Sequence, residues 1–234
     1  VPAFKSLAKD AQKAKVVCMI DNVWKGTFRQ LIGLVYFRAV LKYKFDAVFV
    51  PGRKSERFCR LMGMKRKFIF TGLYGASPDV FSAGLPLSMR PKRFLFIGQF
   101  IERKGIPEIL RASEKLKFFD PDWEVVLVGE GHLRSMAESC SAVRVEPFAS
   151  PEKLAELLRN SRFLLLPSFE EHWGVVVHEA ALCGCGLICS EEVGAVDDLF
   201  DENGFLCSMS DSGGLERAVL NAVKTTGSAL DGIG

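Results

Sequence analysis

Residues 163–190, FLLLPSFEEHWGVVVHEAALCGCGLICS, constrain the fold more than any other stretch of this chain. An apolar run ends at Pro167 and is followed by a polar loop. A helix-period pattern then begins at Gly174 and stops at Gly184, and a second apolar run covers 187–189. This order predicts a strand, a loop, a helix and a second strand, which together form one βαβ unit. Strands joined by a crossover of this kind pair in parallel, so the chain is predicted to contain a parallel sheet.

The rest of the chain shows the same alternation of strands and helices. The other expected strands are 15–20, 45–50, 67–71, 93–97, 124–128, 143–146 and 204–207. The expected helices are 27–44, 55–62, 105–118, 132–140, 152–159, 196–200 and 212–223. Regular alternation predicts an α/β protein with doubly wound parallel sheets. Residues 79–90 have the small and Pro-rich composition of an interdomain hinge.

Charge divides the chain into two parts. Residues 1–92 contain 18 Lys and Arg against 5 Asp and Glu, whereas residues 93–234 contain 13 against 23. Such a difference indicates two domains with different partners. The apolar runs are far shorter than the roughly 20 residues of a membrane-spanning helix, and no signal-peptide pattern is visible. Because the chain starts at Val1, we expect a processed, truncated or partial sequence.

The seven cysteines are scattered along the chain. Three of them, Cys183, Cys185 and Cys189, lie close in sequence, but their spacing straddles a predicted helix end and strand, and no His completes a metal-ligand set. The pattern favours thiols of an apolar core in a reducing compartment.

The loop at 168–174 is the first candidate site. In parallel sheets, ligands bind where loops leave the carboxyl ends of strands, and the first N–H groups of a helix attract anions. Glu171 precedes the predicted helix and Glu179 lies in its second turn. A phosphate on the amides with carboxylates beside it suits a sugar nucleotide, which presents diphosphate and hydroxyl groups together. The alternative is that both glutamates are solvated surface residues.

The same segment resembles the motif of the retaining GT-B glycosyltransferases of family four, which runs much like P-S-x-x-E-G-F-G-x-x-x-x-E-A-x-A-C-G. The matching residues are Pro167, Ser168, Glu171, Gly174, Glu179, Ala180, Cys183 and Gly184. The resemblance implies two Rossmann-like domains, an acceptor-binding one at 1–88 and a nucleotide-sugar (donor) binding one at 89–234. We expect the first to be incomplete, because the family plan has several strands before the one predicted at 15–20.

Family members open the donor domain with a strand, a Gly-Arg pair and then a Lys-Gly pair, and the Arg and Lys hold the diphosphate. Gly98 and Lys104 match this pattern, whereas Gln99 stands where the Arg is usual, and Arg103 is the neighbouring cation. A lysine at a helix N-terminus adds a full charge to the helix dipole, which suits a phosphate. The alternative is a solvated lysine at a turn.

The resemblance also implies roles along the other loops. Gly129 and Gly131 are expected to line the nucleotide pocket and Phe148 to lie near the base, although a lone G-x-G is usually only a tight turn. Glu179 is expected to accept hydrogen bonds from the ribose hydroxyls. Glu171 is expected to meet the donor sugar. Backbone amides at the start of the helix are expected near the sugar hydroxyls and phosphates, and they belong to Trp173, Gly174, Val175 and Val176.

Asp21 follows the first predicted strand, where the family often has a His that faces the reacting carbon of the sugar. It is expected to orient the acceptor or to stabilise an oxocarbenium ion, and the alternative is a cap of a turn or helix. Glu171, Lys104 and Asp21 are therefore the expected catalytic residues. The resemblance implies no obligatory cofactor and no catalytic metal, so neither His172 nor His178 is expected to be a ligand.

The implied reaction is retaining transfer of a sugar from a nucleotide-diphosphate sugar to a saccharide or lipid-linked acceptor, with electrostatic stabilisation of the leaving diphosphate. We expect a cytoplasmic protein, peripheral at the inner face of the membrane, whose basic residues 1–92 contact anionic lipid through the apolar segment 28–44. The alternative for that segment is a buried helix. A nucleic-acid partner is not expected, because no recognition motif accompanies the charge. Two other interpretations are a catalytically silent sugar-nucleotide-binding subunit and a GT-B sugar-nucleotide epimerase.

Overall fold

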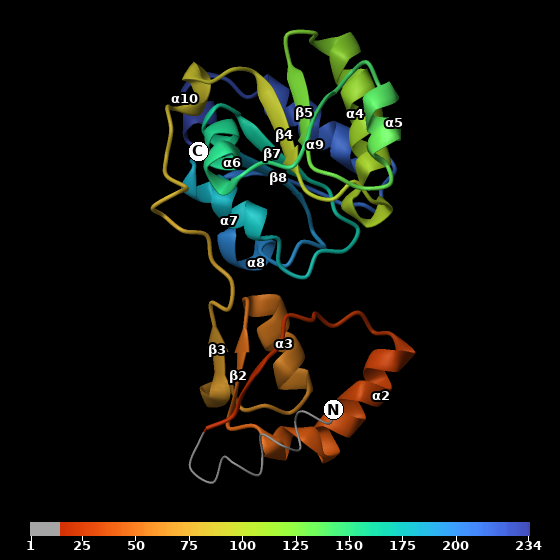
Figure 1. The fold of residues 1–234 in the computed structure, drawn as a ribbon, viewed down its shortest axis with the longest axis vertical. Helices are drawn as coiled ribbons and strands as arrows, with labels where there is room; N and C mark the ends of the chain where they lie inside the picture. The colour runs from red at the N-terminus through yellow and green to blue at the C-terminus, as the bar shows by residue number, and fades with distance from the viewer. Residues whose placement is uncertain (1–14) are drawn as a thin grey trace. The chain divides into compact units, whose positions relative to one another are not determined.

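The computed structural model describes residues 15–234 and divides into two compact units, unit 1 (Val1–Tyr74) and unit 2 (Gly75–Gly234). Figure 1 shows the chain in order from the N-terminus to the C-terminus. The division lies earlier than the one expected after residue 88. Phe81 and Leu87 explain the difference, because both are almost fully buried in the core of unit 2.

Unit 1 contains a three-stranded parallel sheet with the strand order β1-β2-β3. Its strands are β1 (Val17–Met19), β2 (Ala47–Val50) and β3 (Ile69–Thr71). Its helices are α2 (Phe28–Ala39) and α3 (Arg53–Leu61), with short 3₁₀ turns η1 (Leu41–Lys44) and η2 (Arg66–Phe68). The core is small and consists of Phe37, Val48, Val50, Phe58, Cys59, Met62, Met64 and Ile69.

Helix α2 is shorter than the helix predicted over 27–44. Thr27 caps its start by accepting a hydrogen bond from the Gln30 amide (3.3 Å). The helix ends at Ala39 because Val40 leaves helical backbone geometry, with φ −126°. One stripe of the helix, at positions 28, 31, 32, 35 and 36, is apolar and exposed, and only Phe37 is buried. These exposed apolar side chains do not fit the alternative of a buried helix for this segment.

Unit 2 contains a six-stranded, fully parallel sheet with the strand order β6-β5-β4-β7-β8-β9. The strands are β4 (Arg93–Ile97), β5 (Glu124–Val128), β6 (Arg144–Glu146), β7 (Phe163–Leu166), β8 (Gly186–Ser190) and β9 (Gly204–Cys207). Strands β7 and β8 are buried along their whole length, which explains why both read as unbroken apolar runs.

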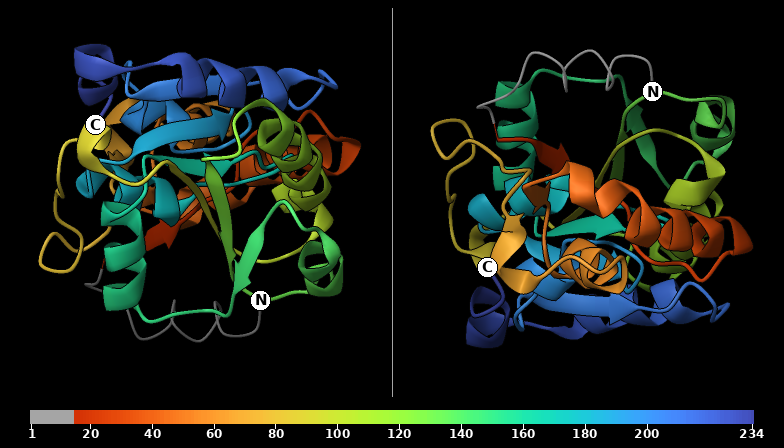
Figure 2. Two further views of the ribbon diagram at one scale, coloured as in Figure 1. Left: turned by 90° about the horizontal axis from the view of Figure 1, so that it is seen from above. Right: turned by 90° about the horizontal axis from the view of Figure 1, so that it is seen from below.

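Helices cover both faces of this sheet. Helices α4 and α9 pack together on one face, and α6 and α7 pack together on the other (Figures 1 and 2). The helices are α4 (Ile106–Phe119), α5 (Arg134–Ser139), α6 (Pro151–Arg159), α7 (Val175–Leu182), α8 (Val196–Leu199), α9 (Gly214–Lys224) and α10 (Gly227–Asp231), with 3₁₀ turns η3 (Leu87–Met89) and η4 (Glu102–Lys104). Sequence analysis did not anticipate α10.

The strand order creates a topological switch point. Strand β4 is hydrogen-bonded to β5 on one side and to β7 on the other, with Phe94 opposite both Val125 and Phe163. The chain therefore winds outward from β4 in two opposite directions. In open parallel sheets, the crevice at such a point, outside the carboxyl ends of the two strands, is the usual ligand site.

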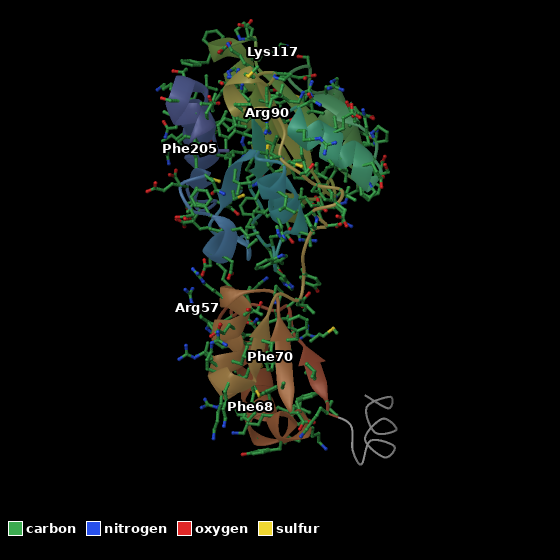
Figure 3. The ribbon with its side chains drawn as sticks, turned by 90° about the vertical axis from the view of Figure 1, so that its left-hand side faces the viewer. Arg57, Phe68, Phe70, Arg90, Lys117 and Phe205 are labelled. Atoms are coloured by element: carbon green, nitrogen blue, oxygen red, sulfur yellow. The ribbon has the colours of Figure 1, made fainter. Side chains whose placement is uncertain are left out.

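A buried arginine fastens the start of unit 2. Arg90, labelled in Figure 3, is 4% exposed. It donates hydrogen bonds to four main-chain carbonyls. The acceptors are the oxygens of Leu85 (2.6 Å), Leu158 (3.4 Å), Ser161 (3.2 Å) and Cys183 (2.9 Å). Burial lowers the pKa of its guanidinium, although the neighbouring carbonyl dipoles satisfy its donors. This cation is therefore a structural clamp and not part of the positive surface counted in the sequence.

Candidate functional site

The loops that follow β4 and β7 meet at the switch point of unit 2. The amide of Phe169 donates to the carbonyl of Arg103 (2.8 Å), and the guanidinium of Arg103 donates to the carbonyl of Glu170 (3.0 Å). Main-chain bonds in both directions fix the two loops against each other. The side chains that the loops carry are consequently presented side by side.

Lys104 and Glu171 form an ion pair between these loops, although they are 67 positions apart. Their side chains are only 12% and 14% exposed. The Arg103 guanidinium lies 4.0 Å from the same carboxylate oxygen, so that one acid meets two cations. Charges this enclosed interact more strongly than charges on the surface, which makes this cluster the electrostatic centre of the loop region.

Helix α7 starts directly beside this pair. Gly174 caps it with φ 91°, a left-handed conformation that favours glycine. A Cβ at Gly174 would lie 3.2 Å from Cγ of Glu171, so that the absence of a side chain lets the loop approach the helix start. The first amides of α7, including those of Val175 and Val176, have no partner inside the helix, as at every helix N-terminus. This start of α7 is therefore suited to an anion.

A third loop, after β8, holds Glu171 from the other side. The Gly194 amide donates to the carbonyl of Glu171 (2.9 Å), and the Ala195 amide donates to that of Trp173 (2.9 Å). Glu171 and Val193 also form an isolated parallel bridge. Sequence analysis assigned no role to this loop. Its only signal was a Val-Gly pair a few residues after a predicted strand, and such a pair is too common to be singled out.

Glu179 lies in the second turn of α7 and is partly buried. Burial raises the pKa of its carboxyl above the usual range. Within residues 15–234, its carboxylate accepts no hydrogen bond from the protein. In the same described range, two further polar atoms nearby in sequence, Ser168 Oγ and Trp173 Nε1, are buried without a partner. The loop and helix therefore hold polar groups whose hydrogen bonding the protein leaves incomplete.

The expected nucleotide-binding residues lie along the same edge of the sheet. The Gly98 amide donates to Val128 O (3.0 Å), and the Gly129 amide donates to Glu146 O (3.1 Å), which continues the strand ladders past their ends. Gly131 follows two positions later and packs against the main chain of Phe100. The other two expected nucleotide-binding residues, Gln99 and Phe148, have exposed side chains, and that of Phe148 is 71% exposed.

Asp21 belongs to unit 1, whereas the residues described above belong to unit 2. It follows β1, and its carboxylate accepts a hydrogen bond from the Tyr74 hydroxyl (3.1 Å). Its main-chain oxygen accepts one from the Ser55 hydroxyl (3.2 Å). The structure thus brings Lys104, Arg103 and Glu171 into contact in unit 2. Asp21 contacts Tyr74 and Ser55 in unit 1. Sequence analysis missed Tyr74, because its partner lies 53 positions away.

Three findings concern other kinds of site. Within residues 15–234, no group of three or more His, Cys, Asp or Glu is arranged to hold a metal ion. No helix in this range combines the length and apolar character needed to cross a membrane. The seven cysteines all fall inside the described range and carry free thiols. Burial raises the pKa of the Cys185 thiol to about 12, which fits an inert core residue.

In a comparison with protein families, the model for glycosyl transferases group 1 matches residues 79–229, well over half of the chain. Among curated proteins, the uncharacterized glycosyltransferase YqgM of Bacillus subtilis is 31% identical over 130 residues. That match covers 52% of this chain and 36% of YqgM. The N,N'-diacetylbacillosaminyl-diphospho-undecaprenol alpha-1,3-N-acetylgalactosaminyltransferase of Campylobacter jejuni is 24% identical over 198 residues, covering 76% of this chain and 50% of that enzyme. The chain thus spans half or less of the length of these relatives.

Solved structures match over nearly the whole chain. Anabaena Alr3699/HepE in complex with UDP has a TM-score of 0.78 at 15% identity, covering 97% of this chain and 67% of that protein. WaaG, a glycosyltransferase involved in lipopolysaccharide biosynthesis, has a TM-score of 0.64 at 14% identity, covering 97% and 73%. At this identity the likeness shows the fold, and that fold is GT-B. The expected α/β fold class is confirmed.

Proposed function

The chain belongs to the glycosyl transferases group 1 family, and from this premise we propose that it transfers a sugar from a nucleotide-diphosphate sugar to a saccharide or lipid-linked acceptor with retention of configuration. In this proposal unit 2 binds the donor and unit 1 binds the acceptor. The observation that carries it is the Lys104–Glu171 ion pair at the start of α7, at the switch point of the unit 2 sheet. Similarity to HepE, described in complex with UDP, supports a nucleotide donor.

The leaving diphosphate is the anion for which this cluster is suited. Lys104 and Arg103 supply full positive charges, and the first amides of α7 supply aligned dipoles. As the bond between the sugar and the phosphate breaks, negative charge grows on the diphosphate. Preorganised donors at that position lower the barrier without reorganising. Gln99 contributes no charge where the family usually has Arg, so Lys104 and Arg103 carry this role.

The two glutamates have separate roles in the proposal. Glu171 is fixed through its main chain by the loop after β8 and through its carboxylate by Lys104, so that it is held rigidly where the donor sugar would lie. Glu179, which has no protein partner within the described residues, accepts hydrogen bonds from the ribose hydroxyls. The acceptor hydroxyl then attacks from the face that the diphosphate leaves. Its proton passes to the departing phosphate, and Asp21 orients the acceptor.

Gly98, Gly129 and Gly131 form a side-chain-free wall for the nucleotide, and the exposed ring of Phe148 stacks on or beside the base. Aromatic side chains left exposed next to a binding edge gain the most when a planar base covers them. Removing the ring should therefore weaken binding of the nucleotide more than it changes turnover. No catalytic metal or cofactor enters this proposal.

Thermal shift with a panel of nucleotide sugars and free nucleotides tests the donor assignment on the full chain. A ligand that binds the native state raises its melting temperature by mass action. The expected result is a shift with one nucleotide family, reduced by Glu179→Ala, while Glu171→Ala binds but loses turnover. A matched control is Glu138→Ala, which removes an exposed acid of α5 on the same unit. Equal shifts and kinetics for all three variants would refute the site assignment.

The basic, apolar face of unit 1 is the basis for a second part of the proposal, contact with an anionic membrane surface. Positions 28, 31, 32, 35 and 36 of α2 expose apolar side chains at helical spacing, and Arg29, Arg38, Lys42 and Lys44 supply cations on or just after the helix. An amphipathic helix of this kind inserts its apolar face at the lipid interface while cations meet anionic headgroups.

Co-sedimentation with liposomes tests this contact. Binding should require anionic lipid, weaken with salt and fall at least tenfold in Phe28→Asp. Phe118→Asp is the control, because Phe118 is an even more exposed aromatic residue in unit 2, at 94% against 77% for Phe28. Binding that is insensitive to lipid charge and to Phe28 would exclude a membrane role for α2.

A further inference from the structure

Tyr74 has no assigned role, yet its hydroxyl contacts a proposed catalytic residue. The hydroxyl lies 3.1 Å from Oδ2 of Asp21 and donates a hydrogen bond to it. Asp21 follows the first strand of unit 1 and Tyr74 follows the third. Between them lies β2, so that the two side chains and their hydrogen bond together span two strand spacings, roughly 9.5 Å. A long and rigid side chain with a terminal donor is what this distance requires.

The main chain on both sides of this contact is fixed. The amide of Ile20, directly before Asp21, donates to Phe49 O (3.0 Å). The amide of Leu73, directly before Tyr74, donates to Val50 O (3.1 Å). Both bonds extend the strand ladders past the ends of β1 and β3. The two residues are therefore attached to the same rigid edge of the sheet, and their separation is set by the sheet and not by loop motion.

A third group completes the arrangement. Ser55 is 2% exposed in the first turn of α3, and its hydroxyl donates to the main-chain oxygen of Asp21 (3.2 Å). Asp21 is thus held at its main chain by α3 and at its carboxylate by Tyr74.

We propose that Tyr74 is a positioning residue that holds the Asp21 carboxylate in the orientation needed for the acceptor. This role rests on the proposed function, in which Asp21 orients the acceptor. In this proposal Tyr74 acts on the acceptor through Asp21. The pKa of the Tyr74 phenol reflects this contact, because burial and the neighbouring Asp21 carboxylate both raise it.

The first test measures the contact itself and needs no substrate. The full chain has three tyrosines, Tyr36, Tyr43 and Tyr74, and selective labelling of tyrosine Cζ with ¹³C allows each phenol to be titrated by NMR. The Tyr74 resonance is assigned by its loss in Tyr74→Phe. In Asp21→Ala the pKa of the Tyr74 phenol should fall toward the ordinary value of about 10. An unchanged titration would overturn the proposal.

The second test measures the consequence for transfer. Tyr74→Phe removes only the hydroxyl, and losing one hydrogen bond to a carboxylate at a partly exposed site should lower kcat/KM for the acceptor about tenfold. Donor hydrolysis without acceptor and donor-induced thermal shift should stay at the wild-type level. Tyr43→Phe, at an exposed position of the same unit, is the control and should match the wild type. In an Asp21→Ala background, Tyr74→Phe should have no further effect.

The outcomes separate the alternatives. If Tyr74→Phe lowers the unfolding midpoint but leaves the acceptor kinetics unchanged, Tyr74 is only structural and the proposal is wrong. If Tyr74→Phe and Asp21→Ala reduce transfer independently, the two residues are not coupled and the proposal is wrong. A wild-type protein that cleaves no nucleotide sugar would refute the proposed function and this catalytic role with it, whereas the NMR titration would still decide whether the contact exists.

Discussion

The Lys104–Glu171 pair allows stability and activity to be separated by one double-mutant cycle. The variants are Lys104→Met, Glu171→Gln and the double variant. Removing one partner of a fully buried pair costs about 3–5 kcal/mol, whereas exposed pairs contribute about 0.2–1 kcal/mol. Side chains that are 12% and 14% exposed lie near the buried limit but keep some water. Each single variant should therefore destabilise unit 2 by about 2 kcal/mol.

The double variant should be less destabilised than the two single effects combined, because neither charge is left unpaired. A coupling energy of about 1–2 kcal/mol is expected. Urea unfolding followed by tryptophan fluorescence measures it. A Trp24→Phe background restricts the signal to Trp123 and Trp173, both in unit 2, so that unfolding of unit 1 does not enter the transition.

Activity should behave in the opposite way. All three variants should lose turnover, by about 10- to 150-fold for each lost charged hydrogen bond, because the restored stability does not replace the charges that meet the ligand. The control cycle uses Lys153 and Glu156, an exposed pair on α6, where coupling of at most about 0.5 kcal/mol is expected. Additive stability changes at Lys104 and Glu171 would refute the ion pair. A double variant with wild-type turnover would refute the site.

Three further changes have defined outcomes. Arg90→Met should lower the stability of unit 2 by about 3 kcal/mol in urea unfolding, since carbonyls bonded to the guanidinium lose their donor. Glu179→Gln should raise the melting temperature at pH 7. The raised pKa of Glu179 means that the stability of the wild type falls as pH rises above about 4. The higher melting temperature of the variant should therefore vanish below that pH. Gly129→Ala should cost about 2–4 kcal/mol in urea unfolding, since its Cβ would collide with the carbonyl oxygen of Gly98 at φ 147°, whereas Gly33→Ala, in open space on α2, should be neutral or stabilising.

Most of the fold was accessible from the sequence because four of the six strands of unit 2 are buried on both faces. Burial on both sides requires an unbroken apolar run, and β4, β5, β7 and β8 all show one. The motif at the start of α7 was accessible for a different reason. A loop, a glycine N-cap and a helix are consecutive in the chain, so that their geometry is local.

Element ends and side-chain partners were less accessible. The helix predicted over 27–44 ends at Ala39. Apolar residues continue beyond that point, at Val40, Leu41 and Tyr43, so periodicity alone gives no stop signal. Arg90 was counted with the positive surface, yet its guanidinium is enclosed by carbonyls from four other positions. No pattern in the sequence distinguishes a buried arginine from a solvated one, because the carbonyls come from main chain of any residue type.

The amino-acid sequence determined by itself that this chain is a parallel α/β protein with a strand, a loop and a helix over 163–184, because apolar periodicity and glycine positions act over a few residues. Only the tertiary structure decided that Lys104 meets Glu171, that the loop after β8 holds that glutamate, and that Tyr74 reaches Asp21. These partners are 23 to 67 positions apart or lie two strands away. Which of them meet depends on strand order and register, and these are set by the packing of the whole sheet.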